Sequence, residues 1–271
     1  MSDSCSGSCS GSCGSCSSCS SCGEDKLARK MSAVSRKIFV LSGKGGVGKS
    51  SVAATVALQL AASGRKVGLL DCDFHGPSLP TILGVTHKKL DYSESDGIIP
   101  LPMGNLKFLS VGLLIDDPDQ AIVWRGPAKM GVIKQLLEDT CWGELDDLVL
   151  DFPPGTGDEI LSACQLIPGE KNAIVVTTPQ EVSLADCRKC LDFCNKLELK
   201  VVGIVENMSY FVCPDCGKAH QLFSADGGKS LAKSYNLPLI AQLPLNPEFM
   251  AACDSGTLAE KLDQFPSLLK F

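Results

Sequence analysis

A glycine- and lysine-rich stretch, GKGGVGKSS at residues 43–51, has the residue types and spacing needed to bind phosphate. Its first glycine and its later GKS run fit the pattern G-x-x-x-x-G-K-[ST], which cradles phosphate groups when a strand precedes it and a helix follows. The glycines let backbone N–H groups converge on phosphate oxygens, and the start of the helix adds positive charge. We therefore expect the loop to bind a nucleotide through Gly43, Lys44, Gly45, Gly46, Val47, Gly48, Lys49, Ser50 and Ser51.

Three side chains of this loop have separate predicted roles. Lys49 would reach the β- and γ-phosphates of ATP and act in catalysis, and the Ser50 hydroxyl would bind Mg²⁺. Lys44 directly follows the first glycine, so the loop carries a second lysine that the general pattern does not require. On its own, Lys44 would be a solvated loop charge.

Carboxylates follow two apolar, strand-like runs later in the chain. Asp71 and Asp73 come after VGLL at 67–70, and Asp151 ends the run DDLVLD. Carboxylates at the carboxyl ends of strands beside a phosphate-binding loop are placed to order Mg²⁺-bound water or an attacking water. We expect Asp151 to hold Mg²⁺ through water, and Asp73 either to act at this site or to be a helix N-cap or turn residue.

A second kind of chemistry is indicated by Cys213 and Cys216, which form a C-x₂-C pair in the tight turn CPDCG. Such turns present two thiolates to one metal. One chain supplies only these two ligands, with His220 as a candidate third. Either a second subunit completes the site or the two thiols form a redox pair. Because Cys253 stands alone, a zinc ribbon within one chain is not expected.

Residues 1–24 consist almost entirely of Ser, Gly and Cys and offer no side chains to build a core, so we expect a flexible tail in the free chain. Its last four cysteines have the spacing C-x₂-C-x₂-C-x₂-C, which can close around a [4Fe–4S] cluster or Zn²⁺. A contiguous run favours iron–sulfur somewhat, and the alternative is a low-complexity tail that oxidises or scavenges metal. The candidate ligands are Cys13, Cys16, Cys19 and Cys22.

A third group of cysteines, Cys187, Cys190 and Cys194, falls on one face of a helix predicted at 181–197. This group also contains a C-x₂-C pair. Three thiols on one face of an amphipathic helix are more often small core residues than ligands, so we expect packing here. Cys72 is expected to be buried for the same reason.

Alternating strand-like and helix-like patterns position these residues. They predict an α/β fold in which a mostly parallel, twisted sheet is flanked by helices, as in P-loop NTPases. Asp158 is expected to cap the helix after the second carboxylate run. Strands are predicted at 38–41, 67–70, 98–101, 106–111, 146–151, 173–177, 200–206 and 237–243, and helices at 49–62, 130–137, 181–197 and 227–235.

Bulk properties limit the domain organisation and the class of function. With 271 residues, 44% of them apolar, the chain suits one ATPase domain at 36–271, preceded at 1–35 by the tail and a polar, partly helical linker. The net charge of −6 argues against a nucleic-acid surface. No apolar run has membrane-spanning length, and cytoplasmic location is expected. Fifteen cysteines then indicate metal, cluster or redox use rather than disulfides.

Five motifs together resemble the Mrp/ApbC family of Fe–S cluster carrier ATPases: GKGGVGKS, DCDFHGPS, DFPPGTGD, VENMSYFVCPDCG and QLPLNP. This family falls in the deviant Walker A class of MinD, ParA and the nitrogenase iron protein. The resemblance implies that Lys44 reaches across an ATP-sandwich dimer, that Asp73 activates the attacking water, and that Asn207 faces adenine. Asn207 could instead be a strand-end turn residue. Cys213 and Cys216 would bridge a labile [4Fe–4S] cluster between two subunits.

The function implied is an ATP-dependent scaffold or carrier with weak ATPase activity, which delivers clusters to apo Fe–S proteins. It would act as a homodimer or as a hetero-oligomer with a related ATPase. The cysteine tail resembles the cytosolic scaffold branch, but Ala28 stands where that branch would place its last cysteine. Alternatives are an electron donor like the nitrogenase iron protein, and a MinD/ParA-like positioning ATPase. The latter predicts a basic or amphipathic surface, which residues 257–271 lack.

Overall fold

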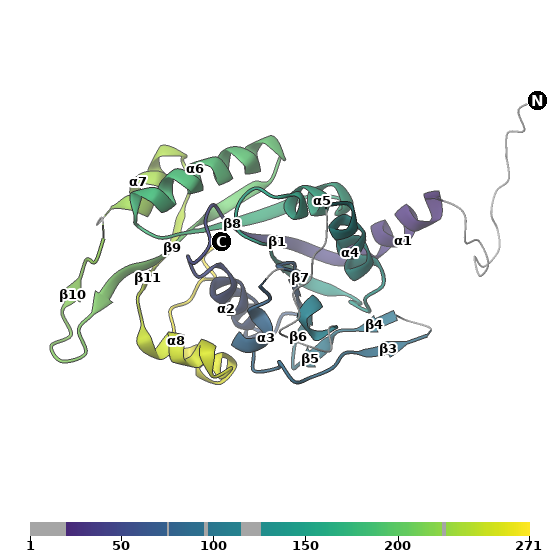
Figure 1. The fold of residues 1–271 in the computed structure, drawn as a ribbon, viewed down its shortest axis with the longest axis horizontal. Helices are drawn as coiled ribbons and strands as arrows, with labels where there is room; N and C mark the ends of the chain where they lie inside the picture. Colours follow the sequence, from purple (N-terminus) through teal and green to yellow (C-terminus); the bar gives the residue numbers. More distant parts are fainter. Residues whose placement is uncertain (1–19, 75, 95–96, 115–125, 224–225) are drawn as a thin grey trace, which may run out of the picture.

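The computed structural model describes residues 20–74, 76–94, 97–114, 126–223 and 226–271, and a nine-stranded sheet runs through this part of the chain (Figure 1). Eight strands lie in the order β10-β9-β8-β1-β7-β2-β6-β5, and β11 pairs with β9. β5 and β10 pair antiparallel with their neighbours, and the other pairs are parallel. The strands are β1 (Val34–Ser42), β2 (Val67–Asp71), β5 (Leu101–Met103), β6 (Leu106–Ser110), β7 (Leu145–Asp151), β8 (Lys171–Thr177), β9 (Lys200–Val212), β10 (Ala219–His220) and β11 (Leu239–Pro244).

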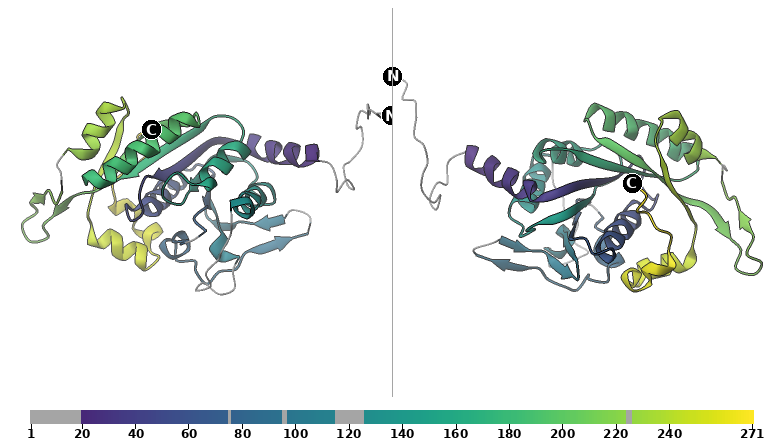
Figure 2. Two further views of the ribbon diagram at one scale, coloured as in Figure 1. Left: turned by 45° about the horizontal axis from the view of Figure 1, so that its top comes forward. Right: turned by 180° about the vertical axis from the view of Figure 1, so that it is seen from behind.

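Helices cover both faces of this sheet, and β3 (Asp91–Ser93) pairs with β4 (Gly97–Ile99) in a separate hairpin. Figure 2 shows the two layers from other sides. The helices are α1 (Ser20–Ser32), α2 (Lys49–Ala62), α3 (Leu79–Ile82), α4 (Gly126–Glu138), α5 (Asp158–Leu166), α6 (Glu181–Lys196), α7 (Gly227–Ser234) and α8 (Pro247–Asp254), with short 3₁₀ helices at Val111–Leu113 and Leu258–Gln264.

The alternation of side chains along the central strands explains the two layers. In β1, Ile38 and Val40 join a core with α2, α3 and α8, whereas Phe39 and Leu41 join a core with α1, α4, α5 and α6. All four side chains have no exposed surface. A strand that is apolar on both faces belongs in the middle of a parallel sheet covered by helices. The predicted α/β class and mostly parallel sheet are therefore confirmed.

Local signals explain several element boundaries. The helix expected at 49–62 has these bounds, and Gly48, with a φ of 82°, starts it. Asp158 is instead the first residue of α5, because Gly157 takes the N-cap position without a side-chain bond. The predicted cap at Asp158 is therefore wrong by one residue.

The segment at 25–35, expected to be a polar linker, contributes to the core. Leu27 and Met31 of α1 are 4% and 0% exposed, and they join the cluster on the α4 side of the sheet. Burial of these two large apolar side chains stabilises the packing of α1 against the domain. The linker interpretation missed this amphipathic pattern, because Leu27 and Met31 are the only large apolar residues among the charges of α1.

Two ends of the molecule matter for function. Figures 1 and 2 show α1 at one end of the long axis and the hairpin of β9 and β10 projecting at the other. The carboxyl ends of β1, β2, β7 and β8 meet at one edge of the sheet, where ligands bind in open α/β sheets. In the described residues, no helix is long and apolar enough to cross a membrane.

Candidate functional site

The phosphate-binding loop connects β1 to α2 at the carboxyl edge of the sheet. Gly46 and Gly48 have φ values of 78° and 82°, in the left-handed region that favours glycine. A Cβ on Gly43 would lie 2.3 Å from backbone atoms of Asp186, so α6 packs directly against the loop. The glycines are therefore needed both for the turn and for the close approach of α6.

Lys49 lies in the first turn of α2 and faces the end of β7. It is 6% exposed, and its ammonium donates to Asp151 Oδ1 at 2.6 Å and to Ser50 Oγ at 3.2 Å. Asp151 has no exposed surface, and within the described ranges its Oδ2 has no hydrogen-bond partner.

This arrangement fits Mg²⁺. A buried carboxylate oxygen without a donor, close to a serine hydroxyl, offers the oxygen ligands that a hard cation prefers. Ser50 and Asp151 are the residues that would hold the ion. When bound with a nucleotide, Mg²⁺ neutralises charge that develops on the transferred phosphoryl group.

Asp71, at the end of β2, lies beside Asp151, its register partner on β7. Asp71 is 1% exposed, and burial raises the pKa of its carboxyl well above the usual range, with a further upward contribution from Asp151. Its oxygens accept hydrogen bonds from the Asp73 N–H at 3.1 Å and from Ser110 Oγ at 2.9 Å. Asp71 therefore holds the start of the segment that carries Asp73.

A cavity of about 450 Å³ brings the loop and the carboxylate segment together. Lys44 is exposed at its mouth, and Asp73 lines it from the segment after β2. Val47 and Asp151 are buried and do not line the cavity. The residues expected to bind nucleotide or Mg²⁺ that line this cavity are Lys44, Gly45, Gly46, Gly48, Lys49, Ser50, Ser51 and Asp73.

The sequence interpretation missed one wall of this cavity. Met250, Cys253 and Asp254 of α8 line it, although no helix was expected at 247–254. Asn246 caps α8, because its Oδ1 accepts hydrogen bonds from the next turn, and Pro247 occupies the first helical position. An Asn-Pro pair is a recognised helix-start signal and could have revealed α8.

Asn207 of β9 contacts the back of the phosphate-binding loop. Its Nδ2 donates to the Val47 carbonyl at 3.0 Å, and a Cβ on Gly48 would lie 2.2 Å from the same Nδ2. Asn207 also borders a small apolar hollow beside α2, whose other lining residues are Val52, Thr55, Leu243, Pro244, Asn246, Phe249, Phe265 and Pro266. The Asn207 amide therefore connects this hollow to the loop.

Cys213 and Cys216 lie in the turn between β9 and β10. The Cys213 N–H donates to the Lys218 carbonyl at 3.0 Å, and the Gly217 N–H donates to the Cys213 carbonyl at 2.9 Å. Gly217 has a φ of 70°. Hydrogen bonds from the backbone N–H groups of Cys216 and Asp215 lower the pKa of the half-buried Cys213 thiol. The turn thus favours the thiolate, the form that binds metal.

The described residues of one chain add no further ligand to this pair. Across 20–74, 76–94, 97–114, 126–223 and 226–271, no three His, Cys, Asp or Glu side chains are placed to hold a metal ion. The suggestion of His220 as a third ligand is therefore wrong for a single chain. Cys13, Cys16 and Cys19 lie outside the described residues, and Cys22 belongs to α1 with its side chain not described.

The three cysteines of α6 are core residues, as expected. Cys187, Cys190 and Cys194 are 1%, 0% and 0% exposed. Burial raises the pKa of Cys187 to about 12. The hydrogen bond with Cys194, together with burial, raises the pKa of Cys190. Thiols in this state are poor ligands and weak nucleophiles.

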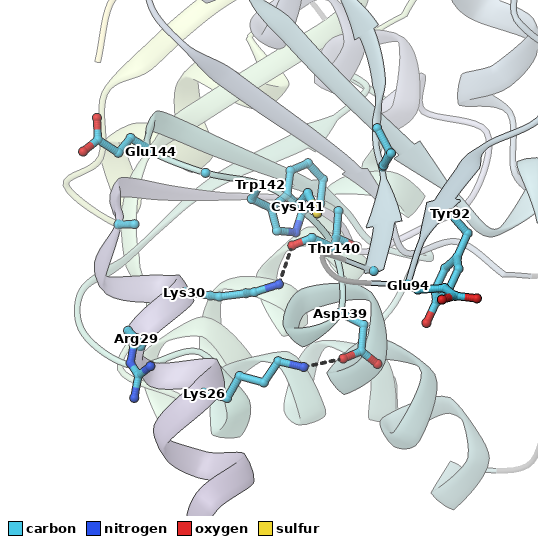
Figure 3. A pocket seen from close by; sticks show the side chains of 14 residues that line it. Lys26, Arg29, Lys30, Tyr92, Glu94, Asp139, Thr140, Cys141, Trp142 and Glu144 are labelled. Carbon is cyan, nitrogen blue, oxygen red and sulfur yellow. Dashed lines mark hydrogen bonds and ion pairs between the residues drawn. The ribbon is translucent and has the colours of Figure 1, made fainter. Parts of the chain in front are cut away.

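A larger cavity, of about 890 Å³, lies away from the phosphate-binding loop. Figure 3 shows α1 on one side of it and Tyr92 of β3 on the other. Lys26 Nζ donates to Asp139 Oδ1, and Lys30 Nζ donates to the Thr140 carbonyl, both at 2.9 Å. These bonds fasten α1 to the segment after α4, and none of the residues expected to bind nucleotide or metal lines this cavity.

Known proteins provide an independent comparison. The family model described as ParA, NUBPL iron-transfer P-loop NTPase, matches residues 33–267. The chain belongs to this family. The iron-sulfur cluster carrier protein of Saccharolobus solfataricus is 47% identical over 233 residues, covering 85% of this chain and 78% of that protein. The cytosolic Fe-S cluster assembly factor CFD1 of Kluyveromyces lactis is 44% identical over 238 residues, covering 85% and 84%.

Solved structures share the fold of this iron-transfer NTPase. A nucleotide-binding protein from Archaeoglobus fulgidus, in complex with ADP, has a TM-score of 0.79 and 34% identity, covering 92% of this chain and 96% of that chain. MinD from Pyrococcus horikoshii, complexed with Mg-ADP, has a TM-score of 0.60 and 25% identity, covering 86% and 90%. The resemblance drawn from the five motifs and the P-loop NTPase fold are therefore confirmed.

Proposed function

We propose that this protein is an ATP-dependent scaffold and carrier, which binds a labile [4Fe–4S] cluster across a homodimer and transfers it to apoproteins. The observation that carries the proposal is the projecting Cys213–Cys216 turn on a chain of the iron-transfer family. A [4Fe–4S] cluster takes four thiolates, and one turn supplies two. Two copies facing each other therefore complete the set, and the names of the relatives support iron–sulfur cargo.

The nucleotide site supports a weak ATPase. Lys49 holds the β- and γ-phosphates, Ser50 and Asp151 hold Mg²⁺, and Asp73 acts on the attacking water. The exposed Lys44 reaches the nucleotide of the partner in an ATP-sandwich dimer. Asn207, which borders the apolar hollow beside α2, faces the adenine base.

Four further parts of the proposal concern the rest of the protein. The tail thiols Cys13, Cys16, Cys19 and Cys22 hold a second cluster. Recipients are apo Fe–S proteins in the cytoplasm. A related ATPase can replace one subunit of the dimer. Nucleic acids and membranes are not partners, and the net charge of −6 supports this for nucleic acids.

Anaerobic cluster transfer tests the proposal. In a tail-serine background, in which all six tail cysteines (Cys5, Cys9, Cys13, Cys16, Cys19 and Cys22) are serine, the protein is loaded with iron and sulfide and then mixed with an apo [4Fe–4S] enzyme. We expect recovered enzyme activity with the parent and none with Cys213→Ala/Cys216→Ala. The matched control is Cys187→Ala/Cys190→Ala, which replaces a buried pair of the same spacing and should still transfer. If the Cys213/Cys216 double variant assembles the same iron content per dimer, the bridging role is wrong.

Nucleotide dependence is tested in the same assay. Lys49→Ala should lose transfer, because the β- and γ-phosphates then lack their lysine. Asp73→Ala should bind ATP with unchanged affinity and lose turnover, measured by phosphate release. Normal turnover in Asp73→Ala would remove Asp73 from the hydrolytic step.

A further inference from the structure

One strand, β9, connects the phosphate-binding loop to the turn that carries Cys213 and Cys216. Asn207 in its middle contacts the phosphate-binding loop, and Cys213 follows its last residue. Met208 lies between them with a φ of 54°, in the left-handed region. A side chain with a Cβ adopts that region only at a cost, and inside a strand it interrupts the extended backbone. The segment that joins the two sites therefore contains a strained residue.

Contacts on both sides hold Met208 in this conformation. The Met208 N–H donates to Asn207 Oδ1 at 3.0 Å, while Asn207 Nδ2 donates to the Val47 carbonyl at 3.0 Å. One amide group therefore bonds the strained residue and the phosphate-binding loop together. Strained residues persist only where the surroundings fix them in this way, and they gather at functional sites.

The residue before Asn207 is anchored as well. Glu206 is 1% exposed, and its carboxylate accepts hydrogen bonds from Ser209 Oγ at 2.7 Å and from Gln242 Nε2 at 2.8 Å. It also accepts one from the Gly228 N–H at the start of α7. The backbone around Met208 is thus tied to β11 and α7, so the strain cannot relax by a local shift of the strand.

The pairing of β9 changes at this point. Gln242 of β11 pairs with Glu206, whereas Pro244 pairs with Tyr210. Between these two pairs, β9 therefore has more residues than β11. Such a bulge bends a strand and redirects its remaining residues. Beyond the bulge, β9 pairs with β10 and projects from the body of the sheet (Figure 1). The direction of the thiol turn therefore depends on the backbone at Met208.

We propose that Asn207 and Met208 are positioning residues for the cluster thiols. Asn207 links the phosphate-binding loop to Met208, and the left-handed Met208 sets the direction in which Cys213 and Cys216 face a second subunit. The proposal rests on the function proposed above, because it concerns nucleotide at the loop and a cluster at the turn. A shift of the Val47 carbonyl on nucleotide binding is then transmitted along β9 to the thiols.

Thiol alkylation tests this proposal. The full-length apo protein, kept reduced, reacts with iodoacetamide with and without Mg-ATP, and peptide mass spectrometry gives the rates at Cys213 and Cys216. In the native protein we expect Mg-ATP to change these rates at least about fivefold, the lower end of typical coupling between sites. Met208→Gly removes the conformational constraint, so the ATP effect should fall to within about twofold, with ATP affinity unchanged.

Two matched variants distinguish the effect of the backbone conformation at Met208 from the effect of its side chain and from added backbone freedom elsewhere. Met208→Ala keeps a Cβ and the left-handed constraint, so it should retain the ATP effect. Asn236, with a φ of 52° in the turn after α7, supplies the second control, since Asn236→Gly adds the same freedom away from β9. The proposal is overturned if Met208→Gly keeps the full ATP effect, or if Met208→Ala loses it too.

Failure of the proposed function gives a different result. If the native protein binds ATP and assembles clusters but shows no ATP effect on the thiols, the positioning role alone is wrong. If no cluster assembles on Cys213 and Cys216 while the ATP effect and its pattern among the variants remain, the carrier function is wrong and the positioning role stands.

Discussion

Two C-x₂-C pairs lie among the residues from 26 onward that the structure describes, and their surroundings differ in burial and in the hydrogen bonds that their thiols receive. Cys187 and Cys190 lie inside α6, almost without exposed surface, and burial raises the pKa of Cys187 to about 12. Cys213 and Cys216 lie in a turn that projects from the sheet, and backbone N–H groups lower the pKa of Cys213. Spacing alone therefore does not identify a ligand pair.

The difference lies in burial and in where the backbone N–H groups point. In α6 burial disfavours the thiolate and the helix uses the N–H groups, so Cys187 and Cys190 stay protonated and pack as small apolar groups. In the turn closed by Gly217, N–H groups are directed at Cys213, and they stabilise a thiolate that iron can bind. Four predictions test this contrast, beginning with the largest expected effect.

Alkylation of the native protein should separate the two pairs most strongly. Cys216 and Cys213 should react with iodoacetamide at the rates of accessible thiols, whereas Cys187 and Cys190 should react at least about a thousandfold more slowly, because they become accessible only when the core opens. Peptide mass spectrometry measures each site. In urea all four should react at similar rates, and rapid labelling of Cys190 in the folded protein would contradict the contrast.

The iron content after reconstitution should also differ between variants of the two cysteine pairs. In the tail-serine background, Cys213→Ala/Cys216→Ala should lower reconstituted iron and sulfide at least about tenfold, because each turn must supply two of the four thiolates that one cluster needs. Cys187→Ala/Cys190→Ala should retain the parent content. Equal losses in both double variants would mean that the turn is not the ligand site.

Folding stability should respond in the reverse order, with the larger effect from a substitution in the buried pair. Cys190→Ala leaves a gap in a packed core and should lower the free energy of unfolding by roughly 1–2 kcal/mol. Cys216→Ala, at an exposed position, should leave the urea midpoint unchanged. Urea unfolding of the apo protein, followed by circular dichroism, measures both. A larger loss of stability for Cys216→Ala than for Cys190→Ala would mean that the Cys216 side chain is packed in the folded protein, and it would contradict the contrast.

The smallest effect concerns the turn itself. Gly217→Ala forces a residue with a Cβ to adopt a φ of 70°, which should loosen the closed turn. We expect the loaded protein to lose its cluster to a chelator roughly fivefold faster. Gly131 of α4, which has open space around it, is the control, and Gly131→Ala should show the parent rate.

The parts of the fold and site that the sequence revealed are those with strong local patterns. The apolar run of β1, the glycine loop and α2 follow one another without a gap, so their order and the bounds of α2 were predictable, although β1 (Val34–Ser42) is longer than the strand predicted at 38–41. Asp151 was found because a carboxylate follows a buried strand. The α6 thiols were placed in the core because their spacing matches one helix face.

Other features depend on contacts far apart in sequence. Leu27 and Met31 are buried only because α4 packs beside α1, which no local pattern in a charged segment shows. The strain at Met208 arises from the bonds of Asn207 and Glu206 to three distant elements. The anchoring role of Asp71 was not predictable either, since its hydrogen bond with Ser110 requires β2 and β6 to be neighbours.

The central claim is that two chains each contribute half of the ligands for one cluster. Native mass spectrometry of the loaded tail-serine protein, sprayed anaerobically without nucleotide, tests it most directly. We expect a dimer that carries four iron and four sulfide ions, and no cluster-bearing species in Cys213→Ala/Cys216→Ala. A [4Fe–4S] cluster on a single chain, or a loaded dimer in the double variant, would contradict the account.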